Sequence, residues 1–190
     1  MEQSGEHLIQ ADRETVWQAL NNPDVLARSI EGCQAMRKLN DEHFQARVKA
    51  KIGPVSATFD LDLQLSDVQP PASYRIEGKV KGGPAGFGKG TAEVSLQEEA
   101  QATRLSYGVQ ASVGGKLAQV GSRLLDGAAR KMADDFFAAF SELVGGGSDL
   151  DNLPVGEAFA PDAAVRESSG QWVIWAVAFG VLALALILAL

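Results

Sequence analysis

Between residues 43 and 65, hydrophobic side chains occupy alternate positions on either side of a Gly-Pro pair, and this alternation is the strongest constraint on the fold. A period of two is typical of strands with one buried face, and Gly53-Pro54 is typical of a turn. With the turn at this pair, Val48 lies opposite Phe59 on the apolar face. Arg47 lies opposite Asp60 on the solvent-exposed face, and this opposite-charge pair is favourable. The pattern predicts an antiparallel hairpin. Its apolar positions are Phe44, Ala46, Val48, Ala50, Ile52, Val55, Ala57, Phe59, Leu61, Leu63 and Leu65.

Further alternating segments follow the hairpin, separated by turns rich in Gly and Pro. They predict three more strands, around 74–80, 92–96 and 105–113. Two short helices are expected before the hairpin: one after a cap at Asp12 and ending at Asn22-Pro23, and one over Asp24–Ser29. We therefore expect an α+β domain with a largely antiparallel sheet.

A long amphipathic segment from Lys116 to Val144 predicts the helix that covers this sheet. Hydrophobic residues recur every three or four positions, and charged residues fill other positions. The predicted buried face consists of Leu117, Val120, Leu124, Ala128, Met132, Phe136, Phe140 and Leu143.

The chain after residue 144 changes character twice. Residues 145–170 are rich in Gly, Pro, Ser and acidic residues without a sustained apolar period, which is typical of a flexible linker. Residues 171–190 carry no charge, and a helix of about 19 residues spans roughly 28 Å, close to the bilayer core. Trp172 and Trp175 at its start favour the headgroup region. We expect a globular domain at 1–144, a linker at 145–170 and a C-terminal membrane span at 171–190.

Charge and cysteine content exclude some classes of protein. The net charge is −7 and the order of the charges shows no basic face, which argues against a nucleic-acid partner. Cys33 is the single cysteine, so no disulfide framework is expected, and a buried structural thiol is its predicted role. The N-terminus lacks the basic start and apolar run of a secretory signal. These features predict a domain on the cytoplasmic face of a bacterial membrane, held by a single-pass C-terminal anchor.

No catalytic or metal-binding set is apparent in the sequence. The glycine-rich stretch 83–91 approaches a phosphate-binding loop, but Gly90 stands where a magnesium-binding hydroxyl belongs and a strand follows. His7 and His43 begin predicted strands without a carboxylate or cysteine at metal-ligand spacing. The Asp60/Asp62 and Asp134/Asp135 pairs are expected to be solvated surface charges. The chain is therefore predicted to be non-enzymatic and to hold no metal or covalent cofactor.

A curved sheet cannot lie flat against a straight helix, so a hydrophobic cavity between them is geometrically plausible. The alternative is that the same side chains pack against each other as ordinary core. The predicted lining residues are Phe59, Leu61, Leu63, Tyr74, Ile76, Tyr107, Leu124, Ala128, Met132 and Phe136. Glycines at 114, 115 and 121 would permit either opening or close packing.

The order of elements resembles the helix-grip fold of the START-like, or SRPBCC, superfamily. Four stretches, 16–27, 48–55, 81–90 and 113–124, and the Phe136-Phe137 pair resemble the family of the G subunit of carbon monoxide dehydrogenase over nearly all of residues 1–144. Glu31 departs from the family pattern, which has a proline there.

The resemblance implies a non-catalytic accessory of a molybdenum hydroxylase of the carbon monoxide dehydrogenase type. Such an enzyme passes electrons to a respiratory quinone, so a membrane-anchored quinone carrier, for menaquinone or ubiquinone, is the leading interpretation. Two others stay open: an adaptor that recruits the enzyme to the membrane with its cavity packed shut, and a domain handling another lipid-like ligand.

Overall fold

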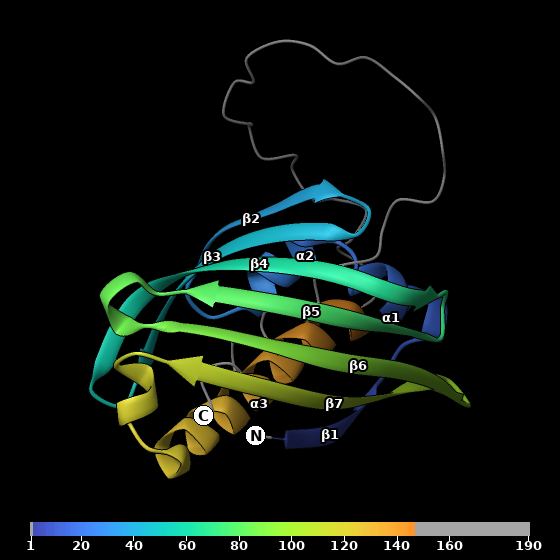
Figure 1. Ribbon diagram of the computed structural model, residues 1–190. Helices are drawn as coiled ribbons and strands as arrows, with labels where there is room; N and C mark the ends of the chain where they lie inside the picture. The colour runs from blue at the N-terminus through green and yellow to red at the C-terminus, as the bar shows by residue number, and fades with distance from the viewer. Residues whose placement is uncertain (1, 147–190) are drawn as a thin grey trace, which may run out of the picture.

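Seven antiparallel strands form one sheet in the computed structural model, which describes residues 2–146 (Figure 1). The sheet order is β1-β7-β6-β5-β4-β3-β2, so consecutive strands from β2 to β7 are neighbours and β1 pairs with the last strand. The strands are β1 (Glu2–Ile9), β2 (Cys33–Asn40), β3 (His43–Ile52), β4 (Val55–Gln69), β5 (Ser73–Lys81), β6 (Phe87–Glu99) and β7 (Ala102–Gly114). The expected antiparallel α+β architecture is confirmed.

The central hairpin has the predicted register. Val48 pairs with Phe59 and Arg47 pairs with Asp60 across β3 and β4. Arg47 Nε donates a hydrogen bond of 2.7 Å to Asp60 Oδ1 on the exposed face. The inward side chains of both strands contribute to the hydrophobic core. Alternation alone is therefore sufficient to place this part of the sheet.

Two short helices, α1 (Arg13–Ala19) and α2 (Pro23–Ser29), connect β1 to β2. Asp12 caps α1 by accepting a 2.9 Å hydrogen bond from the Thr15 amide, as expected of an N-cap carboxylate. Asn22 caps α2, and Pro23 occupies its first turn, where a missing amide hydrogen has no cost. The β2 strand is absent from the prediction, because most of its side chains are exposed and its hydrophobic residues do not alternate.

The C-terminal helix differs from the sequence prediction in its start and in its buried face. A short 3-10 helix, η2 (Leu117–Gln119), precedes Gly121, and the helix α3 runs over Ser122–Gly145. Gly121 has a φ of +92°, so the periodicity does not continue through it. In the first half of α3 the buried face is one residue later than predicted. Its buried residues are Leu125, Ala129, Ala133, Phe136, Phe137, Phe140 and Val144.

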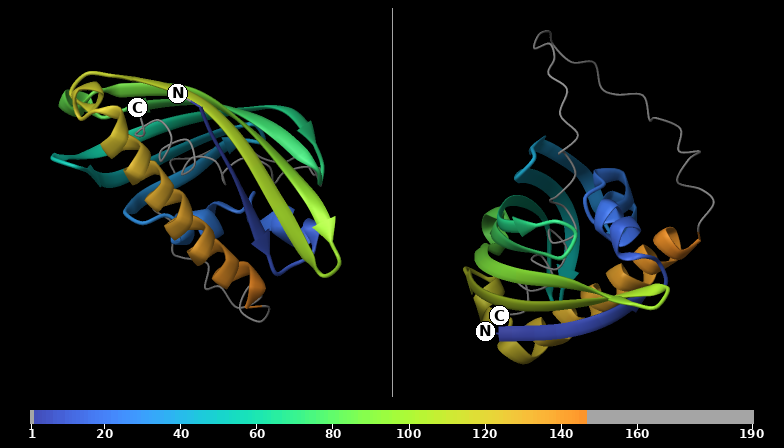
Figure 2. Two further views of the ribbon diagram at one scale, coloured as in Figure 1. Left: turned by 90° about the horizontal axis from the view of Figure 1, so that it is seen from below. Right: turned by 90° about the vertical axis from the view of Figure 1, so that its right-hand side faces the viewer.

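The α3 helix crosses the concave face of the sheet, and α1 and α2 lie beside it (Figure 2). Trp17, Phe44, Phe59, Phe136 and Phe140 are among the largest fully buried side chains. Phe136 packs edge-on against Phe137 and stacks with Phe140. The glycine-rich stretch forms a 3-10 turn, η1 (Gly83–Ala85), followed by β6. It does not open a helix, as a phosphate-binding loop would require.

The predicted linker and membrane span lie outside the described residues, apart from Gly145 and Gly146. Among the helices of residues 2–146, none has the length and hydropathy of a membrane span.

Candidate functional site

A cavity of about 420 Å³ opens between α2, α3 and the β3–β4 hairpin. We call it the α2–α3 cavity. Its apolar lining comes from Ile30 after α2, Ala50 on β3, and Ala128, Met132 and Phe136 along one side of α3. Its remaining lining residues are Ser29, Glu31, Gly32, Lys49, Lys51, Ser56, Lys131 and Asp135. The volume lies within the range of small-molecule sites.

Gly32 sets the wall of the cavity that faces β3. Its φ is +78°, and a Cβ at this position would lie 2.2 Å from the Lys49 carbonyl oxygen. The Lys49 amide donates a 2.9 Å hydrogen bond to the Gly32 carbonyl. Only glycine allows the loop after α2 to approach the strand this closely. The cavity thus depends on a contact between residues distant in sequence.

Charged side chains surround the apolar lining without forming a catalytic set. Lys131 and Asp135 are one helical turn apart and form an ion pair. The hydrogen bond to Asp135, the charge of that carboxylate and, more weakly, Glu31 raise the pKa of Lys131. Ser29 is buried, but its hydroxyl donates to the Val25 carbonyl at 2.8 Å. The site can therefore hold an apolar group inside and meet a polar group at its rim.

Three of the ten predicted ligand-binding residues, Ala128, Met132 and Phe136, line this cavity together. Four others, from β4 and β5, are buried in the core at 0–2% exposure and line neither this cavity nor the outer groove described below. These four are Phe59, Leu61, Leu63 and Ile76. The structure places Leu124 apart from all of them: it is 56% exposed, because α3 begins after Gly121 with a different phase.

The remaining two predicted residues, Tyr74 and Tyr107, are buried beneath a groove of about 710 Å³ on the outer side of the sheet. Burial raises the pKa of both phenols. Groove residues include Arg75 and Glu93, which form an ion pair at 3.2 Å. Most residues that line the groove are polar and these two charges are paired, so the groove does not suit an apolar ligand.

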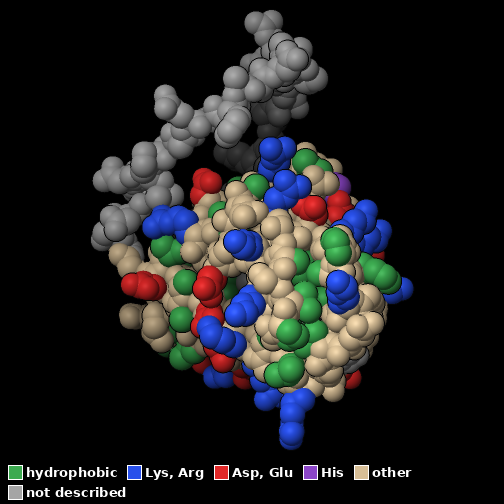
Figure 3. All heavy atoms as spheres, turned by 90° about the vertical axis from the view of Figure 1, so that its left-hand side faces the viewer, with side chains coloured by type: hydrophobic (Ala, Val, Ile, Leu, Met, Phe, Trp, Pro, Cys, Tyr) green, Lys and Arg blue, Asp and Glu red, His purple; other side chains and the backbone are tan. Residues whose placement is uncertain are grey.

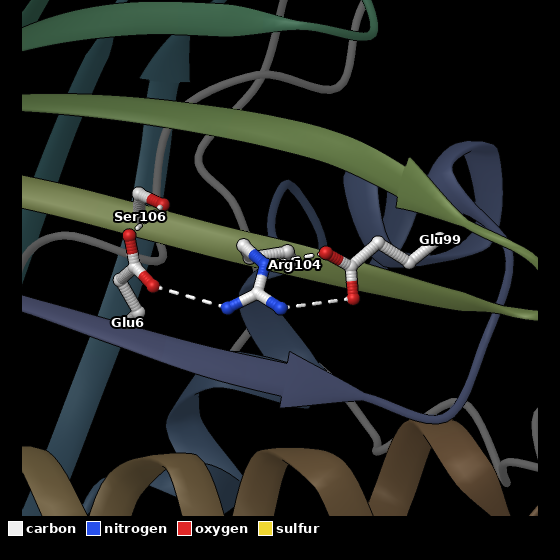
Figure 4. Close-up of polar contacts among 4 residues, drawn as sticks. All are labelled: Glu6, Glu99, Arg104 and Ser106. Atoms are coloured by element: carbon white, nitrogen blue, oxygen red, sulfur yellow. Dashed lines mark hydrogen bonds and ion pairs between the residues drawn. The ribbon is translucent and has the colours of Figure 1, made fainter.

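An ion network on the same outer face ties β1 to β7 (Figure 4). Arg104 donates two hydrogen bonds to Glu99, at 2.6 and 3.0 Å, and one to Glu6 at 3.1 Å. Ser106 donates to the other oxygen of Glu6 at 3.3 Å. The arginine therefore lies between two carboxylates that are far apart in the chain. We assign this network to strand pairing.

Both histidines take part in packing or in cross-strand polar contacts. Burial lowers the pKa of His7, whose ring stacks on Phe137 with centroids 3.8 Å apart. His43 has a carboxylate neighbour across the hairpin, since its Nε2 lies 3.1 Å from Asp62 Oδ2. Gln45 donates to the same oxygen at 3.2 Å. The predicted register already places His43 diagonally across from Asp62, so this pair could have been found from the sequence.

Cys33 is half-buried, and burial raises the pKa of its thiol, which keeps it protonated. Its predicted structural role is compatible with this position at the start of β2, although the side chain is less buried than expected. Over residues 2–146, no group of three His, Cys, Asp or Glu side chains is arranged to hold a metal ion.

Comparison with solved structures gives the same fold. A conserved protein from Geobacillus kaustophilus is 28% identical, with a TM-score of 0.72, and the match covers 77% of this chain and 96% of that one. That chain therefore consists almost wholly of the domain described above. Proteins from Mesorhizobium loti and Thermus thermophilus share the fold at 16% and 15% identity, with TM-scores of 0.55 and 0.54. Each match covers 78% of this chain and 99% of the other.

No curated protein matches the chain. The family model for the G subunit of carbon monoxide dehydrogenase (CoxG) matches residues 5–145, which is nearly the whole described domain. With the helix-grip architecture, this match places the chain in the CoxG family of carbon monoxide dehydrogenase G subunits.

Proposed function

We propose that this protein is a non-catalytic, membrane-anchored accessory of a molybdenum hydroxylase, and that it carries a respiratory quinone between the membrane and the enzyme. Family membership points to an accessory role beside carbon monoxide dehydrogenase. The predicted span at 171–190 would keep the domain near its quinone supply and raise its effective concentration there. The linker would let the domain reach a soluble enzyme.

The observation that carries the proposal is the apolar interior of the α2–α3 cavity with its charged rim. A quinone has a flat ring with two carbonyl oxygens and a long apolar tail. Ile30, Met132 and Phe136 offer contacts to apolar parts of such a ligand, and Lys49 or Lys51 at the rim offers a hydrogen-bond donor to a carbonyl oxygen. A cavity of this volume takes the ring and the start of the tail.

A substitution at Ala128 tests the proposal. Ala128 lines the cavity, whereas Ala138 is exposed on the same helix. Ala128→Trp should fill the cavity and abolish saturable binding of a water-soluble short-chain quinone to the purified domain. Ala138→Trp, the matched control, should bind like the unmodified domain. Equal binding by both variants, or no saturable binding by the unmodified domain, would count against the proposal.

The buried state of Phe59, Leu61 and Leu63 favours a second candidate, the adaptor with a packed core. In that case mass spectrometry of the domain purified from membranes would find no bound quinone, and the full chain would still recover the dehydrogenase with the membrane fraction. A different lipid in the extract would instead support a carrier of another hydrophobic ligand.

A further inference from the structure

The turn regions at one end of the sheet gather cationic side chains that are scattered in the sequence. The β3–β4 turn, the β5–β6 connection and the segment from β7 to α3 all lie at the left-hand end of Figure 1. We define the basic end as the six cations that these regions contribute. They are Lys51, Lys79, Lys81, Lys89, Lys116 and Arg123, all exposed.

Acidic residues are missing from the same regions. The segments 51–59, 78–92 and 111–125 contain no Asp or Glu, although the whole chain has 24 acidic and 17 cationic residues. Three acidic residues pair in register with this region. Asp60 and Asp62 on β4 bind Arg47 and His43 respectively, and Glu77 on β5 lies opposite Thr91. The order of the charges along the sequence does not show this cluster, because antiparallel topology brings separate turns to one end.

Two lysines at the basic end lie directly opposite each other on neighbouring strands. Lys79 on β5 pairs in register with Lys89 on β6, and both side chains are exposed. Like charges in this position destabilise a sheet. Asp62 lies on the other side of Lys79, whereas the uncharged Ser112 lies on the other side of Lys89. Glu77 lies diagonally across from Lys89, but Lys89 forms no ion pair within residues 2–146. Binding to an anionic surface would account for a lysine at this position.

Two large hydrophobic side chains protrude among these cations. Phe87 is 62% exposed and lies opposite both Lys81 and Gly114. A Cβ on Gly114 would lie 2.5 Å from the Phe87 ring, so the ring rests over the glycine backbone. Leu124 is 56% exposed and lies beside the Gly53 turn. Figure 3 views this end and shows cationic and hydrophobic side chains scattered across it, with some acidic side chains also in view.

We propose that the basic end is a docking surface for a membrane that contains anionic phospholipids. Exposed Phe and Leu side chains can enter the headgroup region while lysines bind lipid phosphates. Lysine is depleted in protein–protein interfaces, and all but one of the cations defined above are lysines, which favours a lipid surface over an acidic protein. The apolar segment 172–190 in the same chain adds a sequence-based reason to find a bilayer close by.

This inference does not require that the domain bind a quinone. It goes beyond attachment by the C-terminal segment, because it assigns an orientation: the end with the β3–β4 and β5–β6 turns faces the lipid. Screening at high salt should weaken docking, since the Debye length falls from about 10 Å at 0.1 M to about 3 Å at 1 M salt.

Vesicle co-sedimentation with residues 1–146 tests the proposal without the C-terminal segment. The Geobacillus kaustophilus chain, which consists almost wholly of this domain, indicates that the domain folds by itself. The unmodified domain should bind phosphatidylcholine vesicles that contain phosphatidylglycerol, and bind pure phosphatidylcholine much less. Lys81→Gln with Lys89→Gln should lower the partition coefficient by about 30-fold.

Control variants separate the basic end from charge and hydrophobicity in general. Arg28→Gln with Arg37→Gln makes the same charge change on exposed positions of α2 and β2 and should leave binding almost unchanged. Phe87→Ser should weaken binding by about tenfold, whereas Leu39→Ser, at a leucine of 51% exposure, should not. Circular dichroism checks that each variant is folded.

Two results would overturn the proposal. One is an absence of binding to anionic vesicles by the unmodified domain, which would leave an acidic protein surface as the occupant to test. The other is an equal loss of binding in the test and control variants, which would mean that net charge and not the basic end determines binding.

Discussion

Adjacent leucines at the start of α3 allow a direct test of how this helix is oriented. Leu125 is fully buried, whereas Leu124 is 56% exposed. Leu→Ala removes three carbons, worth about 2.4 kcal/mol in transfer free energy, and a residual cavity adds to this. We expect Leu125→Ala to lower the free energy of unfolding by about 3–5 kcal/mol. Leu124 is less than half buried, so Leu124→Ala should cost at most about 1 kcal/mol.

Urea unfolding of residues 1–146, followed by circular dichroism, measures both values. Because the two variants have the same composition and differ at neighbouring positions, they share the same unfolded-state effects to a good approximation. An unchanged m-value would show that only stability has changed. A larger loss of unfolding free energy in Leu124→Ala than in Leu125→Ala would refute the observed orientation of α3. It would instead support the buried face that the sequence periodicity predicts.

Three further predictions concern pH and backbone. Burial lowers the pKa of His7, so the unfolded chain binds a proton at this histidine at a higher pH than the folded chain does. The free energy of unfolding should therefore fall as the pH is lowered through about 6.5. His7→Gln should make this pH dependence flatter in unfolding free energies measured from pH about 7.5 to about 5. Gly82→Ala would place a Cβ 2.4 Å from a Phe59 ring atom, and denaturant unfolding should show a loss of about 1–3 kcal/mol. Gly127→Ala, in the second turn of α3 with open space around the added methyl group, should raise the thermal midpoint through a gain of up to about 1 kcal/mol.

Local signals in the sequence are sufficient for elements whose geometry is fixed by near neighbours. The alternation at 43–65 predicts the β3–β4 register, and Asp12 and Asn22 cap the helices that follow them. The β2 strand is not predicted from the sequence, because its position at the edge of the sheet leaves most of its side chains exposed to solvent. A period of two reports burial of one face, so a strand without a buried face has no such signal.

The errors on α3 have a specific cause. A single period fits Leu117, Val120 and Leu124, but Gly121 separates a 3-10 turn from the helix and resets the phase. A glycine inside a helical pattern of hydrophobic residues can indicate such a break. The buried face also uses alanines such as Ala129 and Ala133, whose small size gives a weak hydrophobic signal.

The candidate site is harder to predict because it depends on contacts between distant residues. The approach of Gly32 to Lys49 sets one wall of the α2–α3 cavity, and no local pattern encodes this contact. Of the predicted residues, Ala128, Met132 and Phe136 of α3 line this cavity together. The basic end could have been found by listing charges at the predicted turns, since alternate turns of an antiparallel sheet share one end.

Lys51 connects the two proposals, because it lies at the rim of the α2–α3 cavity and belongs to the basic end. If the basic end faces lipid, the cavity opens next to the bilayer, and a quinone can enter without its tail crossing bulk water. Phe87→Ser should then slow quinone loading from anionic vesicles while leaving the affinity for a short-chain quinone in solution unchanged. Ala128→Trp should abolish both the loading of quinone from vesicles and the binding of the short-chain quinone in solution. If Ala128→Trp loads quinone more slowly but keeps normal affinity for the short-chain quinone in solution, the cavity is not the binding site. If Phe87→Ser loads quinone at the normal rate, only the docking surface is contradicted.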